Sequence, residues 1–510
     1  MRLRSHERPG TPTLVLHTQK RERAWLGGTA RDALCERRGP GRLLIVSNRL
    51  PFTVRLAEGI PRLVPSSGGL ATALRGVHER GGTLWLGWSG VAAGLTPATQ
   101  DDIDRRLAER DAVGVPLTER EIEGFYRRYA NEGLWPVLHD RPELAHIDRA
   151  DWATYRAVNV RFAEAIAREL TPGDRVWIHD YHLMLVPRLL RERCPDALIG
   201  YFLHTPFPVL ESLQRLPHRA ALLDGLLGAD MLGFHTPGDA SRFLESVQST
   251  LGRNANAHEV QDGDRGVRVQ ACPISIDFAA MDTRAAAGTV AANAEALRGR
   301  GGALMVGVDR LDYTNGIPER LRAFAELLTR QPEYRGKVRF FQLAVPSREE
   351  IPAYRALRAE VESLVASINA RFGDREWTPV EYKYGTVDAE TLAMLYRAAD
   401  VMVVTPLRDG MNLVAKEFVA SRPDDDGVLV LSEQAGASAE LRAALLVDPK
   451  DVEGLADVYA RALTMSAPER RVRMRRLRRI VRRHDVHQWV RACLLSLGTR
   501  QPSTVGQTAG

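Results

Sequence analysis

The sequence predicts an α/β fold built from two Rossmann-like halves. Short apolar, β-branched stretches alternate with amphipathic stretches of helical period along most of the 510 residues. This alternation is typical of parallel sheets with helices on both faces. It occurs in two series, joined near residues 278–300 by a stretch rich in Ala and Gly. A chain of this length is too long for a single core, so more than one domain is expected.

The first series begins with a predicted strand at 42–48 (RLLIVSN), after which SSGGLATALRGVHER leads through a glycine turn into a helix. Further strands are predicted at 176–182, 198–204 and 229–235, and the segment LMLVPRLLRER is predicted to be helical. Ligands of parallel sheets bind outside the carboxyl ends of the strands. Polar residues follow the strands there, which indicates one wall of a ligand site.

The second series starts near 303–309 (ALMVGVD) and continues with VRFFQLAV, VEYKYG, VMVVTP and VLVLSE. The C-terminal segment RRVRMRRLRRIVRRHDVHQWV predicts a strongly basic helix. We interpret its arginines as a solvated face with Val, Met, Leu and Ile turned inward, and an acidic partner is the alternative. The predicted parts of the chain are a disordered basic extension (1–40), an N-terminal domain (41–280), a C-terminal domain (281–480), a terminal helix that packs back on the N-terminal domain (481–498) and a disordered tail (499–510).

Composition predicts a cytoplasmic enzyme. Hydrophobic content of 44% and charged content of 26% are ordinary for a globular protein. No apolar run approaches the roughly 20 residues of a membrane span, and no apolar core follows the basic N-terminus as it would in a signal peptide. The net charge of +6 suits anionic substrates, but no nucleic-acid motif is present. The four cysteines are scattered without metal-like spacing, so reduced thiols are expected.

The segment VMVVTPLRDGMNLVAKEFVAS (401–421) predicts a site for a nucleotide diphosphate. A buried strand breaks into a turn that holds Asp409, and a helix begins near Asn412. The loop amides and the positive end of the helix dipole can hold a phosphate. Glu417, over a turn into the helix, can accept hydrogen bonds from a ribose diol. An ordinary strand-to-helix corner of an α/β domain is the alternative.

Other strand ends carry groups suited to sugars and phosphates. Aromatic side chains with polar tips suit a carbohydrate site, although core packing explains such residues equally well; they are Trp85, Trp88, Tyr126 and Trp135. The guanidinium groups of Arg310 and Arg348 can clamp phosphates, and surface charge is the alternative for each. The cluster from His179 to His182 lacks a third ligand at suitable spacing, so no metal site is predicted there. A buried, satisfied histidine is the alternative for His204.

The motifs, taken in order, resemble those of the trehalose-6-phosphate synthases. They run from about Arg42 to about Trp489 and include SNRLPF, SSGGL, WLGWSG, NEGLWPVLH, VWIHDYHL, FLHTPFP, DRLDYTNGIPER and TPLRDGMNLVAKE. The resemblance implies a GT-B fold, in which two Rossmann-like domains face each other across a cleft. It implies a retaining hexosyltransferase without metal or cofactor. The implied substrates are a nucleotide diphosphate glucose, usually UDP-glucose, and glucose-6-phosphate, and the implied product is α,α-trehalose-6-phosphate. No nucleic-acid or membrane partner is implied, whereas homo-oligomers are common in the family.

The resemblance also implies a role for individual residues. The implied acceptor pocket consists of Arg49, Trp88, Tyr126, Trp135, Asp180 and Arg348. The implied donor site consists of Gly68, Gly69, Arg310, Asn315, Val387, Asp409, Leu413, Val414 and Glu417. Asp180, His204, Arg310 and Asp409 are the implied catalytic set, in which Arg310 clamps the leaving diphosphate. The UDP, GDP or ADP form of the donor is left open.

One position departs from the family pattern. Asn315 stands where the family's loop carries a lysine that pairs with the arginine on the departing diphosphate. Losing one charge-assisted contact costs roughly 1.5–3 kcal/mol. An active but slowed enzyme, compensation by another cation such as Lys416, and a weakened or regulatory paralogue are the interpretations left open. A related synthase that uses another phosphorylated acceptor, of the glucosylglycerol-phosphate type, is a further alternative.

Overall fold

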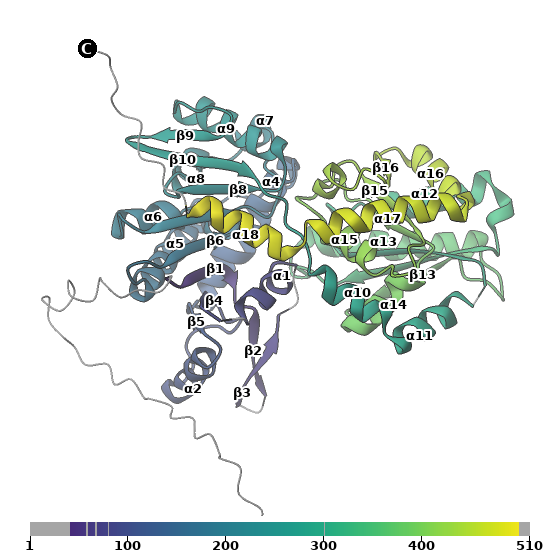
Figure 1. Cartoon of the computed structure of the whole chain (residues 1–510), viewed down its shortest axis with the longest axis horizontal. Helices are drawn as coiled ribbons and strands as arrows, with labels where there is room; N and C mark the ends of the chain where they lie inside the picture. The colour runs from purple at the N-terminus through teal and green to yellow at the C-terminus, as the bar shows by residue number, and fades with distance from the viewer. Residues whose placement is uncertain (1–40, 58–59, 67–68, 80, 300, 499–510) are drawn as a thin grey trace, which may run out of the picture. The chain divides into compact units, whose positions relative to one another are not determined.

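The first half of the chain forms an eight-stranded sheet in the computed structural model, which describes residues 41–57, 60–66, 69–79, 81–299 and 301–498 (Figure 1). Neighbouring strands are parallel except for β9, which is antiparallel to β10. In spatial order the strands are β5 (Ala112–Gly114), β4 (Thr83–Trp88), β1 (Leu43–Arg49), β6 (Arg175–His179), β7 (Leu198–Phe202), β8 (Met231–Phe234), β10 (Arg265–Ala271) and β9 (Glu259–Asp262).

Both faces of this sheet are buried, as β1 shows. Leu44 and Val46 lie in a core that includes α5 (Arg149–Glu169), whereas Leu43 and Ile45 face a second core that includes α1 (Gly69–His78). Successive side chains of a strand point to opposite faces, so a fully apolar strand fits a sheet with helices on both sides. The carboxyl ends of the strands are left for polar residues.

The remaining elements of the first half connect and cover these strands. A short hairpin is formed by β2 (Phe52–Ala57) and β3 (Ile60–Pro65). The helices are α2 (Pro97–Ala108), α3 (Glu119–Glu121), the π-helix η2 (Ile122–Leu134), α4 (Trp135–Leu138), η3 (Pro142–Leu144), η4 (Tyr181–Leu183), α6 (Val186–Arg193), α7 (Leu210–Leu213), α8 (Arg219–Leu226) and α9 (Pro237–Leu251). The helix expected directly after residue 182 begins later, at Val186, after the 3₁₀ turn η4.

The second half forms a six-stranded sheet in which all neighbouring strands are parallel. In spatial order the strands are β13 (Val380–Tyr384), β12 (Val338–Val345), β11 (Ala303–Arg310), β14 (Val401–Val404), β15 (Val428–Ser432) and β16 (Leu445–Val447). The helices are α10 (Phe278–Ala286), α11 (Gly288–Arg298), α12 (Ile317–Arg330), η5 (Pro332–Tyr334), α13 (Pro352–Phe372), α14 (Ala389–Ala398), α15 (Leu413–Ala420), η6 (Gly436–Ala439), α16 (Val452–Thr464) and α17 (Ala467–Arg483). The two predicted series of strands are therefore confirmed as two parallel sheets.

The predicted single basic helix at the C-terminus is wrong in extent. It divides into α17 and α18 (Val486–Leu497), because the side chain of Asp485 caps α18 by accepting a hydrogen bond from the Gln488 amide at 2.9 Å. Figure 1 shows α17 beside the second sheet and α18 beside the first. Helix α18 contacts β7, β8 and α1. The chain thus returns to the first sheet at its end.

Two predictions concern segments outside the described residues, namely the disordered extension at 1–40 and the disordered tail at 499–510. Within the described part of the chain, none of the helices has the length and apolar character needed to cross a bilayer.

Candidate functional site

The end of β1 carries a cationic group that lies on two aromatic rings. The guanidinium carbon of Arg49 is 4.4 Å from the centroid of the Trp88 ring and 5.5 Å from that of Tyr126. Tyr126 in turn stacks on His182, with ring centroids 5.7 Å apart. The described residues offer Arg49 no carboxylate partner. A cation held by aromatic faces and left without a counter-ion is suited to binding an anionic group.

Arg348, beyond the end of β12, is held by a buried network. Its Nη1 pairs with Asp312 Oδ2 at 2.9 Å, and its Nη2 donates to the Tyr181 hydroxyl at 3.1 Å. Tyr354 donates to the same Asp312 oxygen at 2.8 Å. Asp312 is fully buried; burial raises its pKa, but the charges of Arg348 and Arg310 and its hydrogen bonds outweigh burial and leave the pKa below its usual value. This carboxylate therefore fixes the direction in which Arg348 presents its guanidinium group.

Trp135 brings the two predicted phosphate-binding arginines together. The guanidinium carbon of Arg348 lies 4.0 Å from the centroid of its ring, and that of Arg310, the last residue of β11, lies 5.6 Å away. Trp135 belongs to the first half of the chain, whereas both arginines belong to the second half. The predicted acceptor and donor groups therefore meet at this indole ring.

Asp180, at the end of β6, lies in the left-handed region with φ of 77°. A non-glycine residue there stores strain, which is common at functional sites. Burial raises the pKa of Asp180 to about 6, although amide hydrogen bonds and the charges of Arg310 and Arg348 oppose the shift. One carboxylate oxygen accepts a hydrogen bond from the His204 amide at 3.2 Å. The carboxylate can still accept hydrogen bonds from sugar hydroxyls.

His204 is oriented by a second buried histidine. His179 Nδ1 lies 3.0 Å from His204 Nε2, and His179 Nε2 has no partner among the described residues. Burial lowers the pKa of both rings, so both are neutral at pH 7. A proton on His179 Nε2 would leave a buried donor unbonded, which costs more than an unused acceptor. We therefore assign the proton to His179 Nδ1, which donates to His204 and leaves His204 Nδ1–H for a substrate.

The strand β14 ends in a loop that leads to the N-terminus of α15. Asn412 has φ of 69° and caps α15, since its Oδ1 accepts from the Ala415 amide at 3.4 Å. Asp409 accepts from the Asn412 side chain at 3.1 Å, and burial raises the pKa of this carboxyl. Leu413 and Val414 form the first turn of α15, where backbone N–H groups lack partners within the helix. The predicted helix start after β14 is thus present, and its binding of an anion stays a prediction.

Further residues of the predicted donor site lie around α15. Glu417 Oε2 accepts a hydrogen bond from the Tyr396 hydroxyl at 2.8 Å, and burial raises the pKa of Glu417. Val387 is half-buried in the loop between β13 and α14. Gly69 begins α1, and Gly68 lies outside the described residues.

The side chain of Asn315 is buried and hydrogen-bonded to the backbone. Its Nδ2 donates to the carbonyl oxygen of Arg310 at 2.9 Å, and 8% of the residue is exposed. The predicted substitute cation Lys416 is itself occupied, because its Nζ donates to Ile274 O at 2.8 Å and to Glu440 Oε2 at 2.6 Å. Lys416 is 1% exposed. The ion pair that Lys416, on α15, forms with Glu440 is therefore structural.

Sequence reasoning missed several residues of the site. The sequence indicated His179 and Tyr181 only as members of a polar cluster, and it did not indicate Asp312, because the partners of these residues are distant in the sequence. Arg408 is a further residue that the sequence pattern did not indicate; its guanidinium group pairs with Asp140 at 2.7 Å and donates to Phe207 O at 3.0 Å. These contacts join the two halves of the chain beside the site.

The arrangement combines three features that a transfer between two anionic substrates requires. Two separate sets of cationic groups are available, a buried carboxylate can hold sugar hydroxyls, and a helix N-terminus can stabilise a diphosphate. Within the part of the chain that the structure describes, no group of three or more His, Cys, Asp or Glu side chains is arranged to hold a metal ion.

Comparison with known proteins identifies the family. The sequence model described as glycosyltransferase family 20 matches residues 41–499. The chain belongs to this family. Family membership confirms the predicted resemblance and the enzyme class, a glycosyltransferase.

Two curated relatives illustrate the similarity. The trehalose-6-phosphate synthase of Mycolicibacterium smegmatis is 43% identical over 473 residues, which cover 90% of this chain and 93% of the relative. The bifunctional trehalose-6-phosphate synthase/phosphatase of Thermoproteus tenax is 42% identical over 461 residues. This alignment covers 88% of the chain but 62% of the larger protein.

Two solved structures share the fold. An α,α-trehalose-phosphate synthase (UDP-forming) from Burkholderia xenovorans in complex with glucose-6-phosphate is 34% identical, with a TM-score of 0.81. The match covers 90% of this chain and 100% of the Burkholderia xenovorans chain. A protein from E. coli bound with UDP-2-fluoro glucose is 33% identical, with a TM-score of 0.80, and the match covers 91% of this chain and 100% of that one. The predicted GT-B type of α/β fold is thereby confirmed.

Proposed function

We propose that this protein is an α,α-trehalose-phosphate synthase (UDP-forming). It transfers glucose from UDP-glucose to glucose-6-phosphate with retention and produces α,α-trehalose-6-phosphate and UDP. The relatives named as trehalose-6-phosphate synthases, and the neighbours bound with glucose-6-phosphate and with UDP-2-fluoro glucose, support these substrates.

The observation that carries the proposal is the convergence of Arg310 and Arg348 on Trp135, at 5.6 Å and 4.0 Å. A reaction between two phosphorylated sugars needs two cationic groups close together, one for each substrate. We assign Arg49 and Arg348 to the phosphate of the acceptor and Arg310 to the diphosphate of the donor. Trp88, Tyr126 and Trp135 line the acceptor side with apolar ring faces that fit a sugar.

On the donor side, the first turn of α15 and Arg310 stabilise charge on the leaving diphosphate. As the glycosidic bond breaks, negative charge develops on that group, and preorganised N–H donors and a guanidinium group lower the energy of this state. Glu417 holds the ribose hydroxyls, with one of its oxygens already fixed by Tyr396. Gly68, Gly69, Leu413, Val414 and Val387 complete the proposed contacts with the donor.

Around the reacting centre, Asp180, Asp409 and His204 bind the hydroxyls of the two sugars. His204 donates from Nδ1, because its Nε2 accepts from His179. A leaving phosphate oxygen takes the proton of the incoming hydroxyl on the same face of the donor sugar, which gives retention without a protein nucleophile. Asp180 and Asp409 therefore act in binding rather than as the carboxylate pair of a retaining hydrolase.

With Asn315 in place of the family's lysine, this enzyme has one cation fewer at the diphosphate than its relatives with that lysine. Its side chain supports the Arg310 carbonyl at 2.9 Å and carries no charge. If a lysine in its place formed one charge-assisted contact in the transition state, the gain would be about 1.5–3 kcal/mol, or roughly ten- to a hundredfold in rate.

Release of UDP from UDP-glucose, with and without glucose-6-phosphate, tests the proposal. Wild type, Asn315→Lys and Asn315→Ala are compared, since the alanine variant removes the bond to Arg310 without adding a charge. We expect acceptor-dependent release by the wild type and a gain for the lysine variant alone. If neither the wild type nor Asn315→Lys released nucleotide with any donor nucleotide sugar and any phosphorylated acceptor, a synthase would be excluded. Binding of both substrates without turnover would instead indicate a sensor.

A further inference from the structure

Helix α17 is unusually basic, because nine of its 17 residues are arginines. Its apolar residues Met474, Leu477 and Val481 are buried, and the helix contacts α15, α10 and β15. Arg475, together with the pairs at 478–479 and 482–483, follows the spacing of three to four residues that places side chains on one stripe of a helix. The stripe is therefore a continuous row of guanidinium groups.

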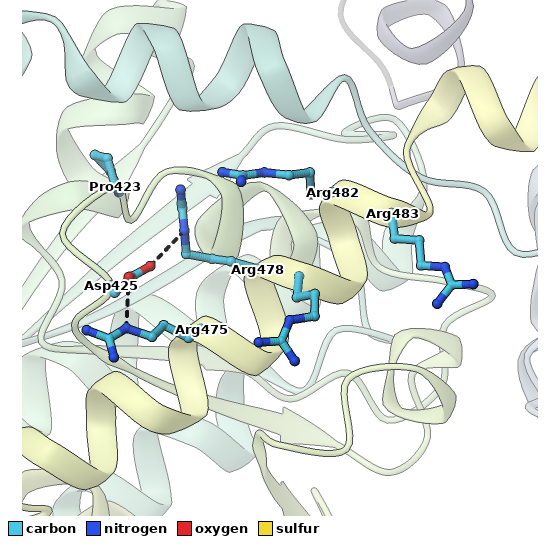
Figure 2. A pocket seen from close by; sticks show the side chains of 7 residues that line it. Pro423, Asp425, Arg475, Arg478, Arg482 and Arg483 are labelled. Atoms are coloured by element: carbon cyan, nitrogen blue, oxygen red, sulfur yellow. Dashed lines mark hydrogen bonds and ion pairs between the residues drawn. The ribbon is translucent and has the colours of Figure 1, made fainter.

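These arginines surround a hollow of about 580 Å³ (Figure 2). Its opposite wall is the loop between α15 and β15, which contributes Pro423 and Asp425. Figure 2 shows the arginines arranged along α17, with Asp425 bonded to two of them. The lining consists of Pro423, Asp425, Arg475, Arg478, Arg479, Arg482 and Arg483.

The positive charge of the lining is not neutralised within the described residues. Asp425 pairs with Arg475 at 3.1 Å and with Arg478 at 3.0 Å. Asp282 on α10 pairs with Arg478 at 2.8 Å and lies 4.0 Å from Arg482. Five guanidinium groups thus face two carboxylates. Neither Arg479 nor Arg483 has an acidic partner in the described part of the chain, so the hollow attracts anions.

One arginine of the set is rigidly placed. Arg478 is 7% exposed, and its Nη1 donates to the carbonyls of Val419 and Ala420 at 3.2 and 2.9 Å. Its guanidinium carbon also lies 5.2 Å from the centroid of the Phe278 ring. Its other guanidinium nitrogens pair with Asp282 and Asp425, so Arg478 forms a fixed floor of the hollow. The exposed Arg479 and Arg483 are the groups left to contact a ligand.

We propose that this hollow is a binding site for a small anion with two or more phosphate groups. Guanidinium groups match phosphate oxygens in pairs, and the volume lies in the range of small-molecule sites. The lining contains no aromatic ring that would stack on a nucleobase, which favours an inorganic or sugar polyphosphate. The lining shares no residue with the proposed transferase site, so the proposal does not rest on the proposed function.

Calorimetric titration with inorganic tripolyphosphate at fixed ionic strength tests the site. The proteins are prepared in an Arg310→Gln background, which weakens binding of the probe at the donor site. Arg479→Gln/Arg483→Gln removes the two unpaired charges of the hollow. Arg471→Gln/Arg476→Gln is the matched control, because both residues are exposed on the same helix and do not line the hollow. We expect the dissociation constant to rise about tenfold or more in the first variant and less than about twofold in the control.

Three results would overturn the proposal. Equal weakening in both double variants would mean general attraction to a basic helix. Binding to the wild type that is lost in the Arg310→Gln background would mean that the probe occupies the donor site alone. Failure of tripolyphosphate to bind, with arginine-dependent binding to vesicles of anionic lipid or to single-stranded RNA, would assign the surface to a macromolecule.

Discussion

Replacement of Arg49 by glutamine gives a direct test of the acceptor site. Arg49 is exposed, lies 4.4 Å from the Trp88 ring centroid and has no carboxylate partner among the described residues. Its removal therefore leaves no buried charge unpaired, in contrast to removal of Arg348, which would leave Asp312 without its partner. The fold is expected to tolerate the change.

The expected effect follows from one lost contact with a phosphate. A hydrogen bond to a charged group contributes about 1.5–3 kcal/mol, which corresponds to roughly a ten- to hundredfold change in affinity. The phosphate of glucose-6-phosphate does not take part in bond breaking. Binding is thus lost equally in the ground state and the transition state, and we expect a higher KM for glucose-6-phosphate with little change in kcat.

Glucose supplies the matched substrate, because it lacks the phosphate. Initial rates of UDP release are measured with glucose-6-phosphate and with glucose for wild type, Arg49→Gln and the control Arg55→Gln, which removes one exposed charge from the neighbouring strand β2. Arg49→Gln should lower kcat/KM for glucose-6-phosphate and leave that for glucose unchanged. An equal loss with both substrates would refute the assignment of Arg49 to the phosphate.

Four further predictions concern three buried groups, His179, Asp180 and Lys416. His179→Phe removes the donor to His204 and should lower kcat/KM about 3- to 10-fold, with partial recovery in His179→Gln, as measured by steady-state kinetics. Because burial raises the pKa of Asp180 to about 6, activity should rise through pH 6 as its carboxylate ionises, and this step should disappear from the pH profile of Asp180→Asn. The raised pKa also means that the folded state binds this proton more tightly than the unfolded state does. The contribution of Asp180 to the free energy of unfolding should therefore fall as the pH rises from 3.8, the usual pKa of an aspartate, to about 6, its pKa in the folded protein. Lys416→Met should destabilise the protein by about 1.5–3 kcal/mol in denaturant unfolding, since it removes the buried ammonium that donates to Glu440 and to Ile274 O and leaves Glu440 with His484 at 3.3 Å; an unchanged midpoint would contradict this role.

The sequence predicted the sheets well because each strand is a short apolar run with helices on both sides. Strands β1, β6 and β14 lie where the apolar runs were found, and polar groups follow each of them. The π-helix η2 was not predicted, because its i→i+5 hydrogen bonds leave no periodicity that distinguishes it from other helices. The break between α17 and α18 depends on the cap at Asp485, a signal that the basic run obscured.

Contacts between distant residues account for what the sequence could not predict. Arg348 was assigned to a phosphate, but its pairing with Asp312 and Tyr181 requires loops from both sheets to meet. Lys416 is the cation that the sequence suggests as compensation for the uncharged Asn315. Its burial against Glu440 shows that proximity in sequence did not indicate which way the side chain points.

The return of α18 to the first sheet has a consequence for synthesis of the chain. Trp489 packs on Trp177 and Phe202, with ring centroids 4.9 and 5.2 Å apart, and donates to Cys272 O across 217 residues of sequence. At ribosomal rates of about 5–20 residues per second, those 217 residues take roughly 10–40 s to make. During that interval one apolar face of β6 and β7 has been translated without its cover. We therefore expect a chain truncated before Val486 to aggregate rather than fold as a stable half.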